Sequence, residues 1–267
     1  MPESHGLGAD ASPLTLIPLV SVAALMLVYL MAARHQRQVG NGWSGWRCVF
    51  FAGGSLLLAA ALAPPALAWA HHDLRGHMAQ HLVIGMLAPL AWVLAAPVTL
   101  LLKTLPAAAA RRLVALLQSR PLRGASHPIA ALLLNVGGMY LLYLTPLYAA
   151  TQQWPVLHAW MHLHFLLAGY LFCWTILAGP DSAPQAHSLH LRLWVLFVSM
   201  AAHAILGKIM YGYLWPRNTG HDVEEIQAAA MWMYYGGDLA EALLAIALMT
   251  MWWRMPRRRR EALPRLF

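Results

Sequence analysis

Seven apolar runs dominate this sequence, and each is long enough to cross a lipid bilayer as a helix. They cover approximately residues 13–33, 47–69, 76–102, 128–149, 156–178, 190–213 and 226–253. About 20 apolar residues span the hydrocarbon layer. The chain is 60% hydrophobic and only 10% charged, whereas soluble domains carry roughly 25% charged residues. We therefore predict an all-α polytopic membrane protein with seven transmembrane helices, forming a single domain over residues 1–267.

The basic residues lie between alternate runs, which predicts the orientation of the chain in the membrane. Those that follow the first, third and last runs are Arg34, Arg37, Arg47, Lys103, Arg111, Arg112, Arg120, Arg123, Arg254, Arg257, Arg258, Arg259, Arg260 and Arg265. Because cytoplasmic loops are enriched in lysine and arginine, we expect the N-terminus outside and the C-terminus in the cytoplasm. The net charge of +8 therefore indicates topology and not a nucleic-acid partner.

Histidines gather at the predicted outer ends of the helices. His77 and His81 are four residues apart at the start of the third run, and His158 and His162 repeat this spacing in the fifth. Residues four apart share one helix face. His203 lies in the middle of the sixth run. Imidazoles that converge in this way are a candidate metal site, and ionisable residues within spans are functional candidates by default.

Copper is the metal that this set of residues favours, because imidazole and thioether both suit it. We predict His81 and His162 as the core ligands, with His77 next and His203 or His158 completing the set. Methionines in the same outer half could add thioether ligands; they are Met78, Met161, Met210, Met231 and Met233. Zinc also accepts imidazoles. The structural alternative is that the histidine pairs hydrogen-bond across helices and the methionines pack in the core.

Two carboxylates, Asp238 and Glu241, interrupt the seventh run. A carboxylate inside a membrane needs a partner or water, so both should face the bundle interior. They either hold helices together through partners such as His203 or a hydroxyl, or they form a proton or cation path. From the rise of an α-helix, we predict that Asp238 lies at the depth of His203 and shares a hydrogen-bond network with it.

Four segments resemble, in order, the motifs of the CtaG-type cytochrome c oxidase assembly family. They are "GHMAQHLVIGMLAPLAWVLAAP", "HAWMHLHFLLAGYLFCWTILAGPD", "LRLWVLFVSMAAHAILGKIMY" and "MWMYYGGDLAEALL". The resemblance implies a seven-helix protein of the bacterial cytoplasmic membrane that is needed to mature haem–copper oxidases and is expected to handle copper. It carries over to His77, His81, His162 and His203. The chain differs from the family before the last helix. The family commonly has an Asp-Gln pair there, whereas Asp222 and Gln227 stand apart in "HDVEEIQAAAMW".

Together these features predict an assembly factor and not an enzyme. It would hold copper transiently and pass it to a haem–copper oxidase subunit, after receiving it from an extracytoplasmic copper chaperone. An alternative is a membrane haem protein with bis-histidine ligation that transfers electrons. A metal-dependent membrane hydroxylase or protease is a third class, but the sequence has no HExxH motif of the kind that zinc proteases use.

Overall fold

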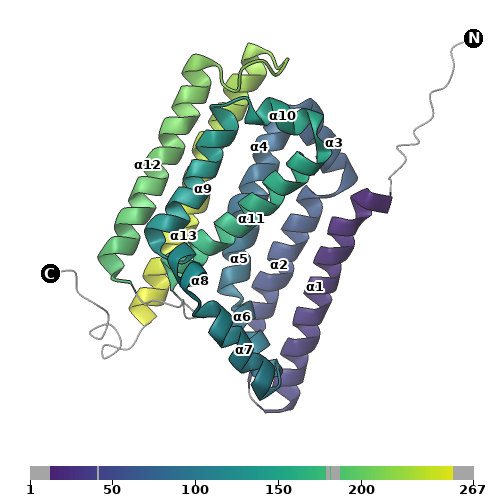
Figure 1. The fold of residues 1–267 in the computed structure, drawn as a ribbon, viewed down its shortest axis with the longest axis vertical. Helices are drawn as coiled ribbons and strands as arrows, with labels where there is room; N and C mark the ends of the chain where they lie inside the picture. Colours follow the sequence, from purple (N-terminus) through teal and green to yellow (C-terminus); the bar gives the residue numbers. More distant parts are fainter. Residues whose placement is uncertain (1–12, 41, 179–180, 182–186, 255–267) are drawn as a thin grey trace, which may run out of the picture.

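The computed structural model describes residues 13–40, 42–178, 181 and 187–254. These residues form a bundle of helices with no strand among them, which confirms the predicted all-α class for the described part. In chain order the helices are α1 (Pro13–Gln38), α2 (Gly45–Ala61), α3 (Pro64–His72), α4 (Leu74–Leu82), η1 (Val83–Leu87), α5 (Ala88–Leu94), α6 (Pro97–Thr104), α7 (Ala107–Leu117), α8 (Arg120–Ala125), α9 (Pro128–Tyr143), α10 (Leu147–Gln153), α11 (Pro155–Leu177), α12 (Leu189–Tyr213) and α13 (Val223–Arg254). Figure 1 shows α12 at one side of the bundle and α1 at the other.

Four of these segments are continuous helices long and apolar enough to cross a membrane, namely Leu16–Gln38, Leu74–Leu94, α11 and α12. The bent pairs α2–α3 and α9–α10 raise the number to six if each pair is one span. The 32-residue helix α13 is not counted with them, and Asp238 and Glu241 lower its hydropathy. The described residues thus support a polytopic membrane protein, and the seventh span and the orientation remain predictions.

Prolines explain where the apolar runs break. The α2–α3 pair bends by 54° where Pro64 begins α3, and the α9–α10 pair bends by 76° near Pro146. Proline lacks an N–H and favours the first turn of a helix. The predicted third span of residues 76–102 was too long. It ends near Ala96, whose φ of 55° is left-handed, and Pro97 then begins the separate helix α6.

The third span also contains a turn of π-helix, η1, between α4 and α5. The N–H of Ala88 donates to the carbonyl of Val83, five residues earlier. Pro89 cannot donate to the carbonyl of Gly85, and in an α-helix its ring would clash there. One extra residue in the turn relieves that clash. A Cβ atom on Gly169 of α11 would overlap the carbonyl oxygen of Gly85, so only glycine lets these two helices cross this closely.

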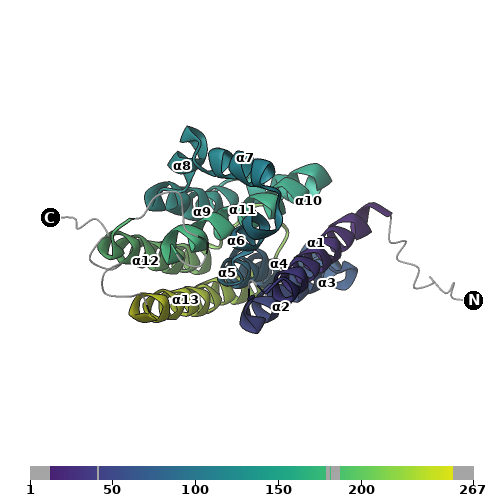
Figure 2. The same ribbon diagram turned by 90° about the horizontal axis from the view of Figure 1, so that it is seen from below.

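The two ends of the bundle differ in chemistry. The basic helices α7 and α8 lie at the end where α1 finishes (Figure 1), and α7 has no buried residue, as expected for a helix on an interface. Seen from below, they lie on the side of the bundle opposite α13 (Figure 2). We call the end of the bundle where α1 finishes the arginine end. The opposite end, where α3 finishes and α4, α11 and α13 begin, is the histidine end. Both cysteines, Cys48 and Cys173, are free.

Candidate metal centre

Helix α4 brings His77 and His81 into the interior at the histidine end. Asp73 begins the helix by accepting a hydrogen bond from the backbone N–H of Arg75 at 2.7 Å. The Arg75 guanidinium also binds this carboxylate, and these contacts lower the pKa of Asp73 below its ordinary value. Gln80 donates to the carbonyl of Ala61 on α2 at 2.7 Å. The two imidazoles on the same helix are only 1% and 5% exposed.

Aromatic rings enclose both imidazoles. His77 and His81 each meet the ring of Tyr143 edge-on, with centroids 6.0 and 6.1 Å apart. His77 also contacts Tyr148, and His81 contacts Phe165 of α11 at 4.5 Å. These rings exclude water from the imidazoles. Gly85 lies beside the His81 ring, because a Cβ atom there would be 3.6 Å from the ring.

Several ring nitrogens in this part of the histidine end lack a hydrogen-bond partner. Among the described residues, neither nitrogen of His77 has one, and Nδ1 of His81 and Nε2 of His162 also have none. The remaining nitrogen of His81, Nε2, lies 3.2 Å from the sulfur of Met139 on α9. Buried polar atoms in proteins are nearly always hydrogen-bonded. Four buried nitrogens without a partner therefore need a physical explanation.

Helix α11 supplies a second group of histidines, and α3 adds to it. His158 and His162 pack edge to face with ring centroids 4.3 Å apart, so the predicted shared face is confirmed. His71, at the end of α3, stacks on His158 with centroids 4.9 Å apart. His164 points elsewhere, because its Nε2 lies 3.1 Å from the carbonyl oxygen of Leu134 on α9.

The two groups meet at α11. His81 contacts Phe165, which lies three residues after His162 on the same helix. Within the described ranges, however, no three His, Cys, Asp or Glu side chains are close enough together to hold a metal ion. The structure therefore places four of the predicted ligands in one region without forming a closed coordination shell.

The fifth predicted ligand, His203, contacts a carboxylate. Its Nδ1 lies 3.1 Å from Oε1 of Glu241, and that oxygen also accepts a hydrogen bond from Ser199 at 2.5 Å. All three side chains are at most 1% exposed. The carboxylate that binds His203 is therefore Glu241 and not Asp238, which is only half-buried. The sequence predicted that a carboxylate of this run joins helices through His203 or a hydroxyl. Glu241 does so with both kinds of partner.

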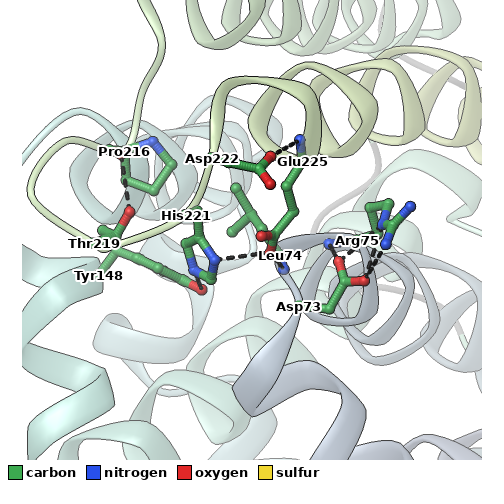
Figure 3. Close-up of polar contacts among 9 residues, drawn as sticks. All are labelled: Asp73, Leu74, Arg75, Tyr148, Pro216, Thr219, His221, Asp222 and Glu225. Atoms are coloured by element: carbon green, nitrogen blue, oxygen red, sulfur yellow. Dashed lines mark hydrogen bonds and ion pairs between the residues drawn. The ribbon is translucent and has the colours of Figure 1, made fainter.

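A hydrogen-bonded network begins at Tyr148, whose ring contacts His77, and includes His221 and Glu225 (Figure 3). The Tyr148 hydroxyl lies 3.2 Å from Nε2 of His221, and Nδ1 of His221 lies 2.8 Å from the Glu225 carboxylate. That carboxylate also accepts a hydrogen bond from the N–H of Leu74 at the start of α4. Asp222 caps α13 by accepting from the N–H of Glu225 at 2.7 Å. The network ties the loop before α13 to both α4 and α10.

Sequence reasoning missed Met139, Tyr143 and Tyr148. Met139 and Tyr143 are four residues apart and so share a face of α9, which is the same signal that identified the histidine pairs. The methionine that contacts His81 is not one of those suggested as ligands from the sequence. Met78, Met161, Met210 and Met233 are buried in the core, whereas Met231 is exposed.

Comparison with known proteins agrees with the predicted resemblance. The family model for the cytochrome c oxidase caa3 assembly factor (Caa3_CtaG) matches residues 27–255. Uncharacterized proteins of Mycobacterium bovis and Mycobacterium tuberculosis are each 30% identical over 262 residues, which cover 90% of this chain and 39% of the relative. One from Mycobacterium leprae is 32% identical over 198 residues, covering 71% of this chain and 30% of that protein.

The chain spans about two-fifths of the length of the first two of these curated relatives. No solved structure matches it. The family match includes every helix from α2 to α13, since α13 ends at Arg254. This chain belongs to the Caa3_CtaG family of cytochrome c oxidase caa3 assembly factors.

Proposed function

We propose that this assembly factor binds copper transiently at the histidine end and passes it to a haem–copper oxidase subunit. The observation that carries the proposal is the contact of His81 Nε2 with the sulfur of Met139, together with buried ring nitrogens of His77, His81 and His162 that lack partners. Imidazole and thioether together suit Cu(I). Copper would be cargo here and not a resident cofactor, so the protein would act as a carrier and not as an enzyme.

The donor set fits this cargo. His81 and His162 are the core ligands that we propose, His77 is the next, and His158 or His203 completes the set. The rings of the first three have buried nitrogens without a hydrogen-bond partner. Because the described side chains do not form a closed site, binding would require the rings to move. An incomplete shell suits a carrier, since cargo must leave as well as arrive.

The proposed setting is a bacterial cytoplasmic membrane, with the histidine end facing outward. The arginine end carries the exposed helix α7, with Arg111 and Arg112, and cytoplasmic surfaces are enriched in such residues. An outward histidine end would let an extracytoplasmic copper chaperone deliver the metal and an oxidase subunit receive it.

Copper binding by the purified protein tests the proposal. Detergent-purified protein is titrated with Cu(I) in competition with a chromophoric chelator, without oxygen. The wild type should bind copper, and the His81→Ala variant should bind far less. His72→Ala, which alters an exposed histidine at the end of α3, should match the wild type.

Two outcomes would overturn the proposal. One is a wild-type protein that takes no copper from the chelator, and the other is a His81→Ala variant that binds as well as the wild type. The same preparation discriminates the haem alternative, because bis-histidine haem would give a Soret band. In cells, His81→Ala and His162→Ala should each lower oxidase activity while the protein still accumulates in the membrane.

A further inference from the structure

Three imidazoles form a row of contacting rings at the histidine end. His71 is exposed at the end of α3, His158 beside it is 9% exposed, and His162 is partly exposed, with its Nε2 atom buried. Each ring contacts the next, with centroid separations of 4.9 and 4.3 Å. The row ends at His162 of α11, whose Nε2 has no hydrogen-bond partner among the described residues.

The bend between α2 and α3 places the first ring of this row. The 54° turn at Pro64 directs α3 across the histidine end, and His71 reaches α10 there. Its Nδ1 lies 3.2 Å from the side-chain oxygen of Gln152. With that oxygen as acceptor, the proton stays on Nδ1 and the lone pair of Nε2 remains free. Metal-binding histidines are commonly held in this way by a carbonyl on the other nitrogen.

We propose that His71 is a surface loading site for Cu(I) and that His158 connects it to the ligands His162, His81 and His77. This inference rests on the proposed function, because it identifies where the cargo enters. His71 takes Cu(I) from the donor, and the ion then moves along His158 and His162 to the other proposed ligands. His71 was absent from the ligands predicted from the sequence.

Ligand exchange between neighbouring rings explains how the ion moves. Metal–imidazole bonds are about 2 Å long, so two rings with centres under 5 Å apart can share one ion after side-chain rotation. At each step one bond from copper to nitrogen forms and the bond to the preceding nitrogen breaks. Copper stays Cu(I), and no electron or proton is transferred. The row avoids release of a bare ion into an apolar interior, which would cost far more.

The rate of copper uptake, measured apart from its equilibrium extent, tests this inference. Detergent-purified protein is mixed with Cu(I) held by bicinchoninate, and loss of the chelate colour is followed by stopped flow. His71→Ala should slow uptake by at least about tenfold, which corresponds to roughly 1.4 kcal/mol in the barrier. The final copper content should equal that of the wild type, because the buried ligands are unchanged.

Two further variants make the result specific. His72→Ala, its exposed neighbour, should load at the wild-type rate. His71→Met keeps a copper ligand at the surface and should restore most of the rate. Uptake by His71→Ala at the wild-type rate, with a wild type that binds copper, overturns the loading site and leaves the proposed function intact. A wild type that binds no copper overturns both.

Discussion

His203 of α12 and Glu241 of α13 join two long neighbouring helices through a contact of 3.1 Å that is almost wholly removed from solvent. Oε1 of Glu241 serves two partners, since Ser199 also donates to it. Three polar side chains in the middle of an apolar bundle thus bind one another.

Removing one partner of this cluster should destabilise the protein strongly. In Glu241→Ala, both His203 and Ser199 lose their acceptor, which we expect to cost about 3–5 kcal/mol. Glu241→Gln keeps an acceptor oxygen and should lose less. Thermal unfolding in a single detergent measures the difference. An alanine variant as stable as the wild type would show that the cluster does not join the helices.

The sulfur of Met139 should contribute to copper affinity. Met139→Leu keeps the volume of the side chain but removes the thioether beside His81. We expect Cu(I) affinity to fall about tenfold, or roughly 1.4 kcal/mol, in chelator competition. Met210→Leu, at a buried methionine of α12, is the matched control and should bind as the wild type does. Equal affinity for both variants would remove Met139 from the ligand set.

The crossing of α11 and η1 should not tolerate a methyl group. In Gly169→Ala, the new Cβ would overlap the carbonyl of Gly85, and overpacking costs about 1–3 kcal/mol even against side chains. Gly137→Ala is the control, since nothing lies within 4 Å of its Cβ position and alanine favours a helix. Thermal unfolding should separate the two variants clearly. Equal unfolding temperatures would contradict the close crossing.

Acid should weaken the start of α4. The guanidinium of Arg75 lowers the pKa of Asp73 below its ordinary value of 3.8, so the folded state favours the carboxylate. The resulting stability is present at neutral pH and is lost as the pH falls through the lowered pKa. Asp73→Asn should therefore be less stable than the wild type at neutral pH, and the difference should shrink below 3.8. Unfolding midpoints across this pH range measure it, and a constant difference would exclude the ion pair as its cause.

Reporter fusions test the orientation. Fusions after Arg123 and after Phe267 should both report a cytoplasmic position, because the basic loops alternate with nearly uncharged ones. The structure places α8 and the end of α13 toward the same end of the bundle (Figure 1). A fusion after Gly220, in the loop before α13, is the control and should report an external position. An external signal from either basic site would refute the orientation.

Helix content and the gathering of histidines could be predicted, because both follow from local periodicity. Spacing of four residues placed His77 with His81, and the structure buries both. The choice between Asp238 and Glu241 could not be made in this way. Rise per residue gives depth along a helix, and these two carboxylates differ by less than one turn. Which of them meets His203 depends on the rotation of α13 against α12, and that is set by packing along both helices.

Met139 escaped prediction for a related reason. Its partner His81 lies 58 residues earlier, and the contact requires α9 to pack beside α4. The sequence pattern indicates which residues share a face of each helix, but it does not indicate which helices pack against one another. The proposed ligands were therefore chosen by chemistry and depth, and the neighbours that surround them came only from the structure.

The π-turn η1 separates the third span into two segments whose side-chain faces are set independently. One additional residue rotates the rest of the helix by about 100°, because an α-helix advances 3.6 residues per turn. Before the turn, His81 faces Met139 of α9; after it, Trp92 donates to Ser55 of α2 at 3.1 Å. In a helix of uniform pitch, fixing either contact would turn the other side chain away from its partner. Deleting one residue within 83–87 would therefore change the face that the imidazoles present without changing any imidazole.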